Sequence, residues 1–380
     1  MSSPAVSDAP GKHAVLGLRA EVRAFLRDAR AGGAFTPRCD SWLSGFSRPF
    51  SAALGARGWI GLNWPSAYGG RDRPEIERYA ITEELLAAGA PVAAHWIAQR
   101  QTGPLLLRYG TEAQKQRFLP AIARGECAFA ILMSEPGAGS DLAAVRTRGT
   151  QVDGGWRISG RKIWTSHAHE SDFGILFCRT SDATADRHAG LSQLMLDLRA
   201  PGVSIRPIRL LNGEEHFSEI TLDDVFIADD MVVGRIGDGW RQVTSELALE
   251  RSGPERFMSV LPLILAFVEA TRGEERRAEL VGRIAAQLFA LRSLSLSIVE
   301  ALSSGGDAAV NAALTKDLGT RFEQEVTEAI RVAWDAEPDV SGNDVSRLLA
   351  QAILASPNFT LRGGTNEILR GIVAESVLSR

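Results

Sequence analysis

Several features are scarce in this 380-residue chain, and each scarcity narrows what the protein can be. Its three cysteines, Cys39, Cys127 and Cys178, are irregularly spaced, which argues against a disulfide framework or a zinc site. The net charge is only −4 at pH 7. No excess of basic residues therefore points to nucleic acid or an anionic membrane surface as a partner.

Long apolar runs are also missing. The longest, VLPLILAFV from Val260, contains Pro262 and falls well short of the roughly 20 residues that cross a bilayer. The opening MSSPAVSDAPGKH is polar and has no apolar centre, so we expect no signal peptide. Because 45% of the residues are hydrophobic, the chain can build the cores of two or three domains. We expect a soluble protein of a reducing compartment, the cytoplasm, without a membrane partner.

Helical spacing dominates from about Ala14 to Gly125. The segment VLGLRAEVRAFLRDAR places its apolar side chains on one helix face: Val15, Leu18, Val22, Phe25 and Leu26. Further along, GTEAQKQRFLPAIARG predicts a helix with Thr111 as N-cap and Gly125 at its end. The first third of the chain is therefore predicted to be a set of packed helices.

Past Cys127 the pattern changes to short alternating or apolar segments, broken by Gly, Asp and Pro. QVDGGWRISGRKIWTS, DFGILFCRT, SQLMLDL and SEITLDDVFI predict strands of a small antiparallel β domain. From Gly239 onward the spacing is helical again. The sequence thus predicts a mainly α protein with a central β domain, divided into domains 1–128, 129–234 and 235–380.

Two segments of the β domain carry candidate binding groups. ILMSEPGAGSDL leads from a strand into a glycine-rich turn, which lets a ligand approach the backbone beside Ser134 and Ser140. It is neither a Walker loop nor a G-x-G-x-x-G loop, because Leu142 stands where the third glycine belongs. A plain turn between strands explains this segment alone equally well.

The second segment is ISGRKIWTSHAH. Trp164, with the hydroxyls of Thr165 and Ser166, could stack on an aromatic ring and hydrogen-bond its edge. A single tryptophan in a strand is more often part of the core, so only the combination of both segments favours a ligand. His167 and His169 lack a third ligand at metal spacing, so we expect a polar surface there and no metal.

Four segments together resemble the acyl-CoA dehydrogenase family in order and spacing: YGTEAQKQRFLPAIARGE, SEPGAGSDL, SGRKIWTS and LERSGPERF. The resemblance covers roughly residues 14–380. It implies an N-terminal helical bundle, a small antiparallel β domain and a C-terminal four-helix bundle, with FAD between the β domain and the helical domains. It also implies α,β-dehydrogenation of an acyl-CoA thioester. One carboxylate removes the pro-R α-proton, and the β-hydride goes to flavin N5.

The resemblance also implies which residues contact FAD and CoA. Those implied along the two faces of the flavin ring are Ile131, Met133 through its amide, Ser134, Trp164, Thr165 and Ser166, with Ser166 facing N5. Ser140 would lie near the CoA moiety. Thr365 and Glu367, at the start of the last helix, would contact the pyrophosphate or adenylate end, where a helix N-terminus favours an anion. A plain N-cap role for Thr365 is compatible with this contact.

The position of the catalytic base is unusual. In many members the base precedes Gly-Thr in the last segment, but here NFTLRGGTNEILR has Gly363 at that position, followed by Gly364. Other members carry the glutamate on the first helix of the C-terminal domain, directly before an arginine. ELALERSGPERF supplies Glu250 and Arg251 there, so the resemblance implies Glu250 as base and Arg251 as an anchor for the thioester or the glutamate. Partial desolvation would raise the pKa of Glu250. Outside this motif, a helical glutamate is usually a surface residue.

Trp96 and two absent family motifs bear on the substrate and the assembly of the protein. Trp96, near His95 and Arg100, falls at the family's pocket floor, where a bulky side chain favours a short or a broad, shallow acyl group. The family's Arg-x-x-Phe-Gly and Gln-x-x-Gly-Gly-x-Gly motifs are absent, so the adenosine end of FAD is held differently or by another subunit. We expect a homodimer or homotetramer, with an α2β2 heterotetramer as alternative. The electron acceptor is an electron-transfer flavoprotein or another carrier.

Two other functions stay open on the same scaffold. Relatives without the final-segment glutamate include flavin oxidases, monooxygenases and desulfinases, and the chain could also be a non-catalytic subunit of an α2β2 acyl-CoA dehydrogenase. The leading hypothesis remains a dehydrogenase of fatty acid or steroid side-chain metabolism.

Overall fold

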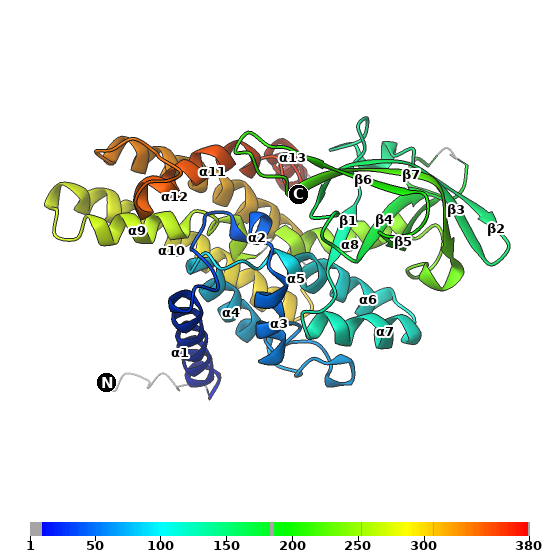
Figure 1. Ribbon diagram of the computed structural model, residues 1–380, viewed down its shortest axis with the longest axis horizontal. Helices are drawn as coiled ribbons and strands as arrows, with labels where there is room; N and C mark the ends of the chain where they lie inside the picture. The colour runs from blue at the N-terminus through cyan, green and yellow to red at the C-terminus, as the bar shows by residue number, and fades with distance from the viewer. Residues whose placement is uncertain (1–9, 183–185, 252, 307, 379–380) are drawn as a thin grey trace.

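The computed structural model describes residues 10–182, 186–251, 253–306 and 308–378, and in it helices precede and follow one sheet (Figure 1). The N-terminal part contains short turns at Ser66–Tyr68 and Ala98–Thr102, the latter a π-helical stretch. Its α-helices are α1 (Pro10–Ala31), α2 (Ser41–Ser44), α3 (Arg48–Ala56), α4 (Glu75–Ala87), α5 (Ala93–Ile97), α6 (Gly103–Tyr109) and α7 (Glu112–Ala123). The predicted helical start of the chain is confirmed.

Helix α7 begins with a reciprocal cap. The Thr111 hydroxyl accepts a hydrogen bond from the Gln114 N–H at 3.2 Å, and the Gln114 side-chain oxygen accepts one from the Thr111 N–H at 2.9 Å. This arrangement confirms Thr111 as N-cap. The Gln114 amide nitrogen also donates to the carbonyls of Asp230 and Val232, at 2.7 and 2.8 Å. The cap therefore joins the first helical part to the segment that leaves the sheet.

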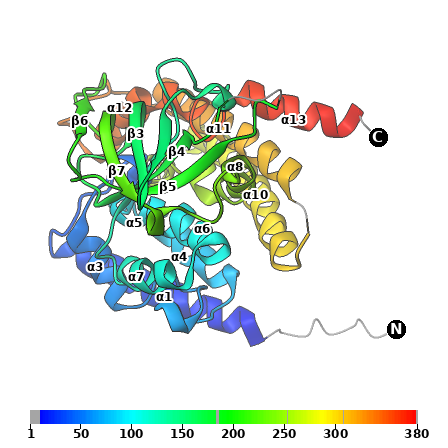
Figure 2. The same cartoon turned by 90° about the vertical axis from the view of Figure 1, so that its right-hand side faces the viewer.

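The middle of the chain forms a seven-stranded curled sheet in the order β1-β4-β2-β3-β7-β6, with β5 paired to β4 (Figure 2). The strands are β1 (Phe129–Leu132), β2 (Arg148–Val152), β3 (Gly155–Ser166), β4 (Phe173–Arg179), β5 (Leu191–Asp197), β6 (Val203–Ile208) and β7 (Phe217–Ala228). Most pairs are antiparallel as predicted, but the single residue pair between β2 and β4 is parallel, and so is the pairing of β1 with β4. The β2–β3 hairpin lies between them in sequence and supplies the long connection that a parallel pair needs.

The C-terminal part is helical: α8 (Gly239–Arg251), α9 (Leu261–Ala270), α10 (Glu275–Ser303), α11 (Ala309–Ala333), α12 (Asp344–Phe359) and α13 (Asn366–Leu378). Helix α11 is central and packs against α8, α10, α12 and α13. Helix α10 has the length and apolar composition of a membrane-crossing helix, yet it packs against α11 of this bundle and against α4 of the N-terminal part. We therefore assign α10 to the bundle.

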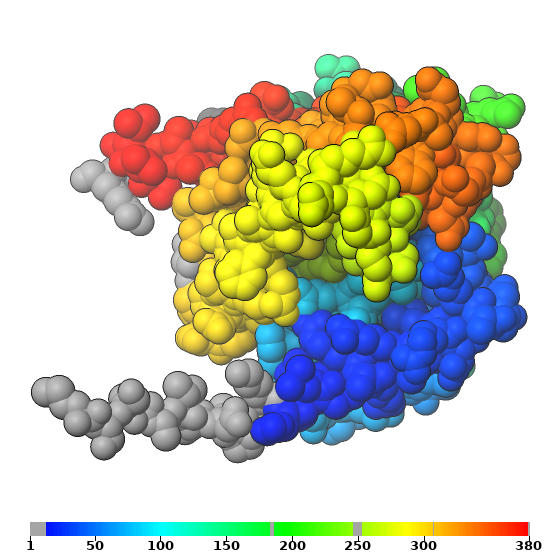
Figure 3. Space-filling model, turned by 90° about the vertical axis from the view of Figure 1, so that its left-hand side faces the viewer, coloured from blue at the N-terminus to red at the C-terminus, as the bar shows by residue number. Residues whose placement is uncertain are grey.

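The two helical parts form one body. Figure 3 shows the N-terminal helices (blue) lying against α9 and α10 (yellow), and α4 contacts both helices. One hydrophobic cluster runs through both helical parts and the sheet. We retain 1–128, 129–234 and 235–380 as proposed domain boundaries, since β1 begins at Phe129 and α8 begins at Gly239.

Candidate functional site

The two β-domain segments singled out in the sequence lie against each other. Just after β1, the carbonyl of Ser134 accepts a hydrogen bond from the Ile163 N–H of β3 at 2.9 Å. The neighbouring carbonyl of Met133 accepts one from Lys162 Nζ, also at 2.9 Å. Both bonds join positions 29 residues apart in the chain, so the segments Ile131–Ser134 and Trp164–Ser166 lie close together in the fold.

The Trp164 side chain is exposed at the protein surface. The register between β3 and β7 shifts between Lys162 and Thr165, and Trp164 within this irregularity has a φ of 59°. Its side chain is 54% exposed and meets Phe217 edge-to-face at 5.9 Å between ring centroids. A left-handed backbone costs a bulky residue about 1–3 kcal/mol, so its surroundings must hold it there. The exposed ring excludes the alternative of a core tryptophan.

The neighbouring hydroxyl has an unusual environment. Thr165 is 1% exposed, and its Oγ1 has no hydrogen-bond partner among the residues that the structure describes. A buried hydroxyl without a partner costs free energy, so it is commonly satisfied by a ligand or water. An exposed aromatic face beside such a hydroxyl suits a planar ring with polar edge atoms.

The glycine-rich turn after β1 is open. A Cβ added to Gly137 or Gly139 would meet no atom within 4 Å. Neither glycine has a positive φ, so neither turn geometry nor packing in the described chain requires glycine. Ser140 is exposed at the end of this turn. The turn thus offers bare backbone and a hydroxyl to a ligand.

The loop before α13 combines two left-handed glycines with a helix cap. Gly363 and Gly364 have φ values of 66° and 85°. Thr365 Oγ1 accepts from the Ile368 N–H at 3.4 Å, which confirms its N-cap role. Glu367 is exposed, and its own backbone N–H and the Thr365 hydroxyl hold its pKa below the usual range. The predicted contacts of Thr365 and Glu367 with FAD remain predictions.

The space over Gly363 is filled by a cation. A Cβ on Gly363 would stand 3.0 Å from two guanidinium nitrogens of Arg256, which is 2% exposed. Any side chain there would be strained by the positive φ and would have to displace Arg256. The turn that carries Arg256 follows α8 almost directly. Position 363 therefore supplies no proton acceptor. Helix α8 ends shortly before Arg256, the residue that covers Gly363.

Trp96 lies in a buried aromatic layer that reaches the same place. Its ring is 5.6 Å from that of Trp42, and the Arg256 guanidinium lies 5.2 Å from the Trp42 ring. Arg100 lies 5.7 Å from the Trp96 ring and forms a buried ion pair with Glu255 at 2.7 Å. Trp96 is 7% exposed. The Trp42 ring therefore lies next to both Trp96, the predicted pocket floor, and Arg256, which covers Gly363.

A group of charged residues in this layer was not found from the sequence. Arg362 donates to Asp40 at 2.5 Å and to Ser259 Oγ at 2.9 Å. Glu323 accepts from the Ser259 N–H at 2.6 Å, and burial raises the pKa of Glu323 to about 7. Along the chain, Arg362 lies 322 residues from Asp40 and 103 residues from Ser259. No local spacing signals such contacts.

Glu250 and Arg251, the predicted base and anchor, belong to α8. Their side chains lie outside the described residues, so the predicted roles of both stay predictions. Helix α8 contacts the π-helical stretch that contains Arg100, and it contacts α11. The predicted base thus stands on a helix that borders the layer under Gly363.

Comparison with known proteins decides the family. The chain matches the descriptions "Acyl-CoA dehydrogenase, N-terminal domain" over residues 16–126, "middle domain" over 130–225 and "C-terminal domain" over 237–378. It is 35% identical to the acyl-CoA dehydrogenase IpdE1 of Mycobacterium tuberculosis, over 95% of this chain and 96% of IpdE1. The chain belongs to the acyl-CoA dehydrogenase family.

Other relatives agree on this family. The chain is 35% identical to the acyl-CoA dehydrogenase FadE34 of Mycobacterium tuberculosis over 86% of its residues, although it spans only 45% of the length of FadE34. Among solved structures, the Tcur3481–Tcur3483 steroid ACAD superimposes with a TM-score of 0.85 at 30% identity, covering 97% and 98% of the two chains. The ChsE4–ChsE5 complex of Mycobacterium tuberculosis does so at 0.81 and 27%, covering 99% of both chains. The expected fold and an oxidoreductase of acyl-CoA dehydrogenation in general are confirmed.

Members of the acyl-CoA dehydrogenase family are flavoproteins. The residues present here fit such a cofactor, on three observations of this chain. Trp164 offers an exposed ring, Thr165 offers an unsatisfied hydroxyl, and Gly137 and Gly139 leave open backbone. Within the described ranges, no group of three or more His, Cys, Asp or Glu side chains is arranged to hold a metal ion.

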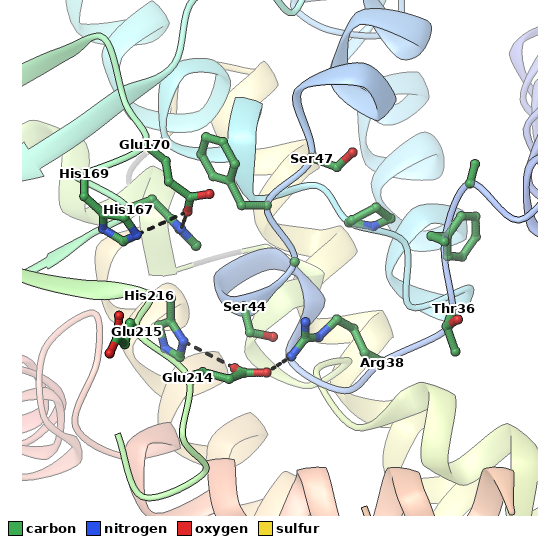
Figure 4. A pocket seen from close by; sticks show the side chains of 15 residues that line it. Thr36, Arg38, Ser44, Ser47, His167, His169, Glu170, Glu214, Glu215 and His216 are labelled. Atoms are coloured by element: carbon green, nitrogen blue, oxygen red, sulfur yellow. Dashed lines mark hydrogen bonds and ion pairs between the residues drawn. The ribbon is translucent and has the colours of Figure 1, made fainter. Parts of the chain in front are cut away.

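A polar pocket of about 650 Å³ lies beside this site, between the N-terminal helices and the sheet (Figure 4). Glu214 lies between His216 and Arg38 on one side, and His167 contacts Glu170 on the other. Contrary to expectation, His167 is buried, with Nε2 2.6 Å from the Leu43 carbonyl. The residues that line the pocket include none of the predicted site residues that the structure describes. It adjoins the site at His167, which follows Ser166 in the chain, and at His216, which precedes Phe217.

Proposed function

We propose that this acyl-CoA dehydrogenase binds FAD and oxidises the Cα–Cβ bond of an acyl-CoA thioester, with Glu250 as the base. One observation carries the proposal. The exposed Trp164 ring and the Thr165 hydroxyl, which lacks a hydrogen-bond partner in the described chain, lie next to the segment Ile131–Ser134. In this proposal, Trp164, Thr165 and Ser166 contact one side of the flavin ring. Ile131, the Met133 amide and Ser134 contact its other parts, and Thr365 and Glu367 approach the pyrophosphate or adenylate end.

The proton step falls to the protein. Gly363 cannot accept a proton, and the guanidinium of Arg256 occupies the space above it. Glu250, on the helix that leads into the Arg256 turn, is the carboxylate we assign to the α-proton. A bound acyl chain excludes water from this helix end, which raises the pKa of a carboxylate toward neutrality and makes it a better base. When bound, FAD supplies the acceptor for the β-hydride.

The remaining substrate contacts follow from the open turn and the aromatic layer. Ser140 and the bare backbone at Gly137 and Gly139 suit the polar CoA moiety. Arg251 anchors the thioester or Glu250. Gly363 and Gly364 contact the substrate through their backbone, beside the Arg256 guanidinium that covers Gly363. Trp96 closes the pocket floor against Trp42.

The acyl group we propose is broad and shallow, of the steroid-derived kind. Two observations support it: the bulky Trp96 floor, and 30% identity to a structure described as a steroid ACAD. We further propose an oligomer, a homodimer or homotetramer, or an α2β2 assembly like the two-protein complexes among the structural relatives. An electron-transfer flavoprotein or another carrier accepts the electrons, and the protein works in the cytoplasm.

The proposal is tested by purifying the chain, recording its visible spectrum with and without added FAD, and titrating it anaerobically with a panel of acyl-CoAs. The panel includes straight short and medium chains and a ring-bearing acyl group. We expect a yellow protein whose flavin absorbance bleaches with at least one acyl-CoA. Mass spectrometry of the product should show the loss of two hydrogens.

Two results would overturn the proposal. Protein that stays colourless with excess FAD would instead be a non-catalytic subunit, and co-expression with a partner would then be needed for activity. Flavin that is reduced only by another donor, with peroxide or a hydroxylated or desulfinated product, would indicate an oxidase, monooxygenase or desulfinase.

A further inference from the structure

A buried ion pair lies directly behind the exposed Trp164. Lys162 is 0% exposed and Glu135 9% exposed, and Lys162 Nζ lies 2.9 Å from Glu135 Oε1. Neither residue has a role in the chemistry described above. Two charges removed from water are retained only where their geometry is well satisfied, so this pair has a specific structural purpose.

Apart from their bond to each other, the side chains of Lys162 and Glu135 bond to backbone groups after β1 and before β2. Lys162 Nζ donates to the Met133 carbonyl at 2.9 Å. Glu135 accepts from the Arg146 N–H at 2.7 Å and from the Thr147 N–H at 2.9 Å. The pair therefore ties three segments together: the end of β1, the start of β2 and β3.

Lys162 also stands at the irregularity that displays Trp164. It is the last residue in regular register with β7 before the shift, and Trp164 follows two residues later with a φ of 59°. After the shift, His167 has a φ of 51°, and its N–H donates to the His216 carbonyl at 2.7 Å. The left-handed Trp164 thus lies between two anchors. The one before it also holds the Met133–Ser134 segment, because Lys162 bonds to the Met133 carbonyl and Ile163 to the Ser134 carbonyl.

We propose that the Glu135–Lys162 pair is a positioning device that sets the distance and angle between the Trp164 ring and the Met133–Ser134 backbone. These two elements bound the flavin in the proposed function, on which this inference rests. Lys162 donates to the Met133 carbonyl, and the Ile163 N–H donates to the Ser134 carbonyl. Loss of the Lys162 ammonium removes the first of these two bonds and so weakens the hold on the strained β3 bulge. The bulge would then relax toward regular register and turn Trp164 away from the segment.

The test uses the full chain labelled with 5-fluorotryptophan. Trp164 is assigned among the eight tryptophan signals by its loss in Trp164→Phe. Lys162→Met keeps the straight aliphatic chain and removes the ammonium. Ile227→Ala, at the other end of the β3–β7 pair, is a control that lowers the stability of the same domain without touching the bulge.

We expect the Trp164 signal of Lys162→Met to shift or broaden in protein without FAD, while Ile227→Ala leaves it in place. FAD binding should weaken about tenfold or more in Lys162→Met only. Glu135→Gln replaces one of the two accepting oxygens by an NH2 donor, so it must lose at least one of the bonds from Lys162, Arg146 and Thr147. It should therefore change both properties in the same direction but to a smaller extent, and it serves if Lys162→Met does not fold.

An unmoved Trp164 signal with unchanged FAD affinity in Lys162→Met and Glu135→Gln overturns the proposal. An equal change of the Trp164 signal and FAD affinity in Ile227→Ala also overturns it, because the ion pair would then only stabilise the domain. The fluorine signal needs no cofactor or substrate. Failure of acyl-CoA to bleach the flavin would therefore count against the proposed function and leave the result on positioning intact.

Discussion

At the scale of single residues, Glu323 carries the clearest electrostatic consequence. Its carboxyl is fully buried near Arg362 and Asp40, and burial raises its pKa from 4.5 to about 7. The folded protein therefore binds the proton more tightly than the unfolded chain. The contribution to stability is complete below about pH 4.5 and is lost as the pH rises through about 7.

Glu323→Gln cannot ionise, and its amide oxygen can still accept from the Ser259 N–H. Unfolding measured at a series of pH values should show the native protein losing stability relative to Glu323→Gln between pH 4.5 and 7. The loss should be on the order of 3 kcal/mol. A stability difference that does not change with pH would contradict this assignment.

Trp96 is the residue whose size should set the acyl preference. Trp96→Ala opens the layer next to Trp42 and should raise kcat/KM for bulky acyl-CoAs relative to short ones. It should also cost about 3–5 kcal/mol of stability, as large-to-small changes of buried aromatics do. Trp59→Ala, equally buried in another part of the N-terminal core, is the control that costs stability without changing the preference. An unchanged preference in Trp96→Ala would refute the pocket-floor role.

At the scale of elements, Gln114 shows how one side chain joins two parts of the fold. It completes the cap of α7 and donates to the carbonyls of Asp230 and Val232 beyond β7. Gln114→Leu removes all three bonds and should lower the free energy of unfolding by about 2–3 kcal/mol. Gln116→Leu, on the exposed face of the same helix, should change it by less than about 0.5 kcal/mol. Equal losses of unfolding free energy in the two variants would show that the three Gln114 bonds do not stabilise the fold.

The elements themselves were largely predictable, and the reasons are local. Apolar spacing predicted α1, and the Thr111–Gln114 cap is visible in the sequence as Thr-x-x-Gln. The parallel pairing of β1 with β4 was not predictable, because alternation within a strand does not name its partner. The left-handed Trp164 was equally hidden, since its conformation depends on a register shift against β7.

At the scale of the whole molecule, one buried ion pair joins residues near opposite ends of the chain. Arg362 lies between the rings of Trp42 and Phe359, 4.4 and 4.7 Å from their centres, and pairs with Asp40. Asp40 has a φ of 54°, which asparagine also tolerates. Asp40→Asn should therefore remove the charge without straining the backbone and destabilise the protein by about 3 kcal/mol.

The control for this prediction is Asp344→Asn. It breaks the exposed pair of Asp344 with Arg347 and should cost less than about 1 kcal/mol. Thermal unfolding of both variants provides the comparison. A cost for Asp40→Asn no greater than that for the control would mean that the buried pair does not hold the two helical parts together.

The site could be predicted only where sequence neighbours form it. Trp164–Ser166 and Ile131–Ser134 are contiguous motifs, and the structure brings them together through bonds to Met133 and Ser134. Arg256 over Gly363 and the Arg362–Asp40 contact arise from packing of distant helices, which motif spacing does not encode. The absence of a base at Gly363 was readable from sequence. The reason glycine fits there, a positive φ beneath a guanidinium, was not.

The central claim is that the proton acceptor stands on α8 at Glu250. The most direct measurement is the anaerobic rate at which a reactive acyl-CoA bleaches the flavin of Glu250→Gln, compared with the native protein and with Glu246→Gln, one turn earlier on the same helix. Loss of the base should slow bleaching by about a hundredfold or more in Glu250→Gln, with FAD still bound, and leave Glu246→Gln close to native. Bleaching at the native rate in Glu250→Gln would contradict the account.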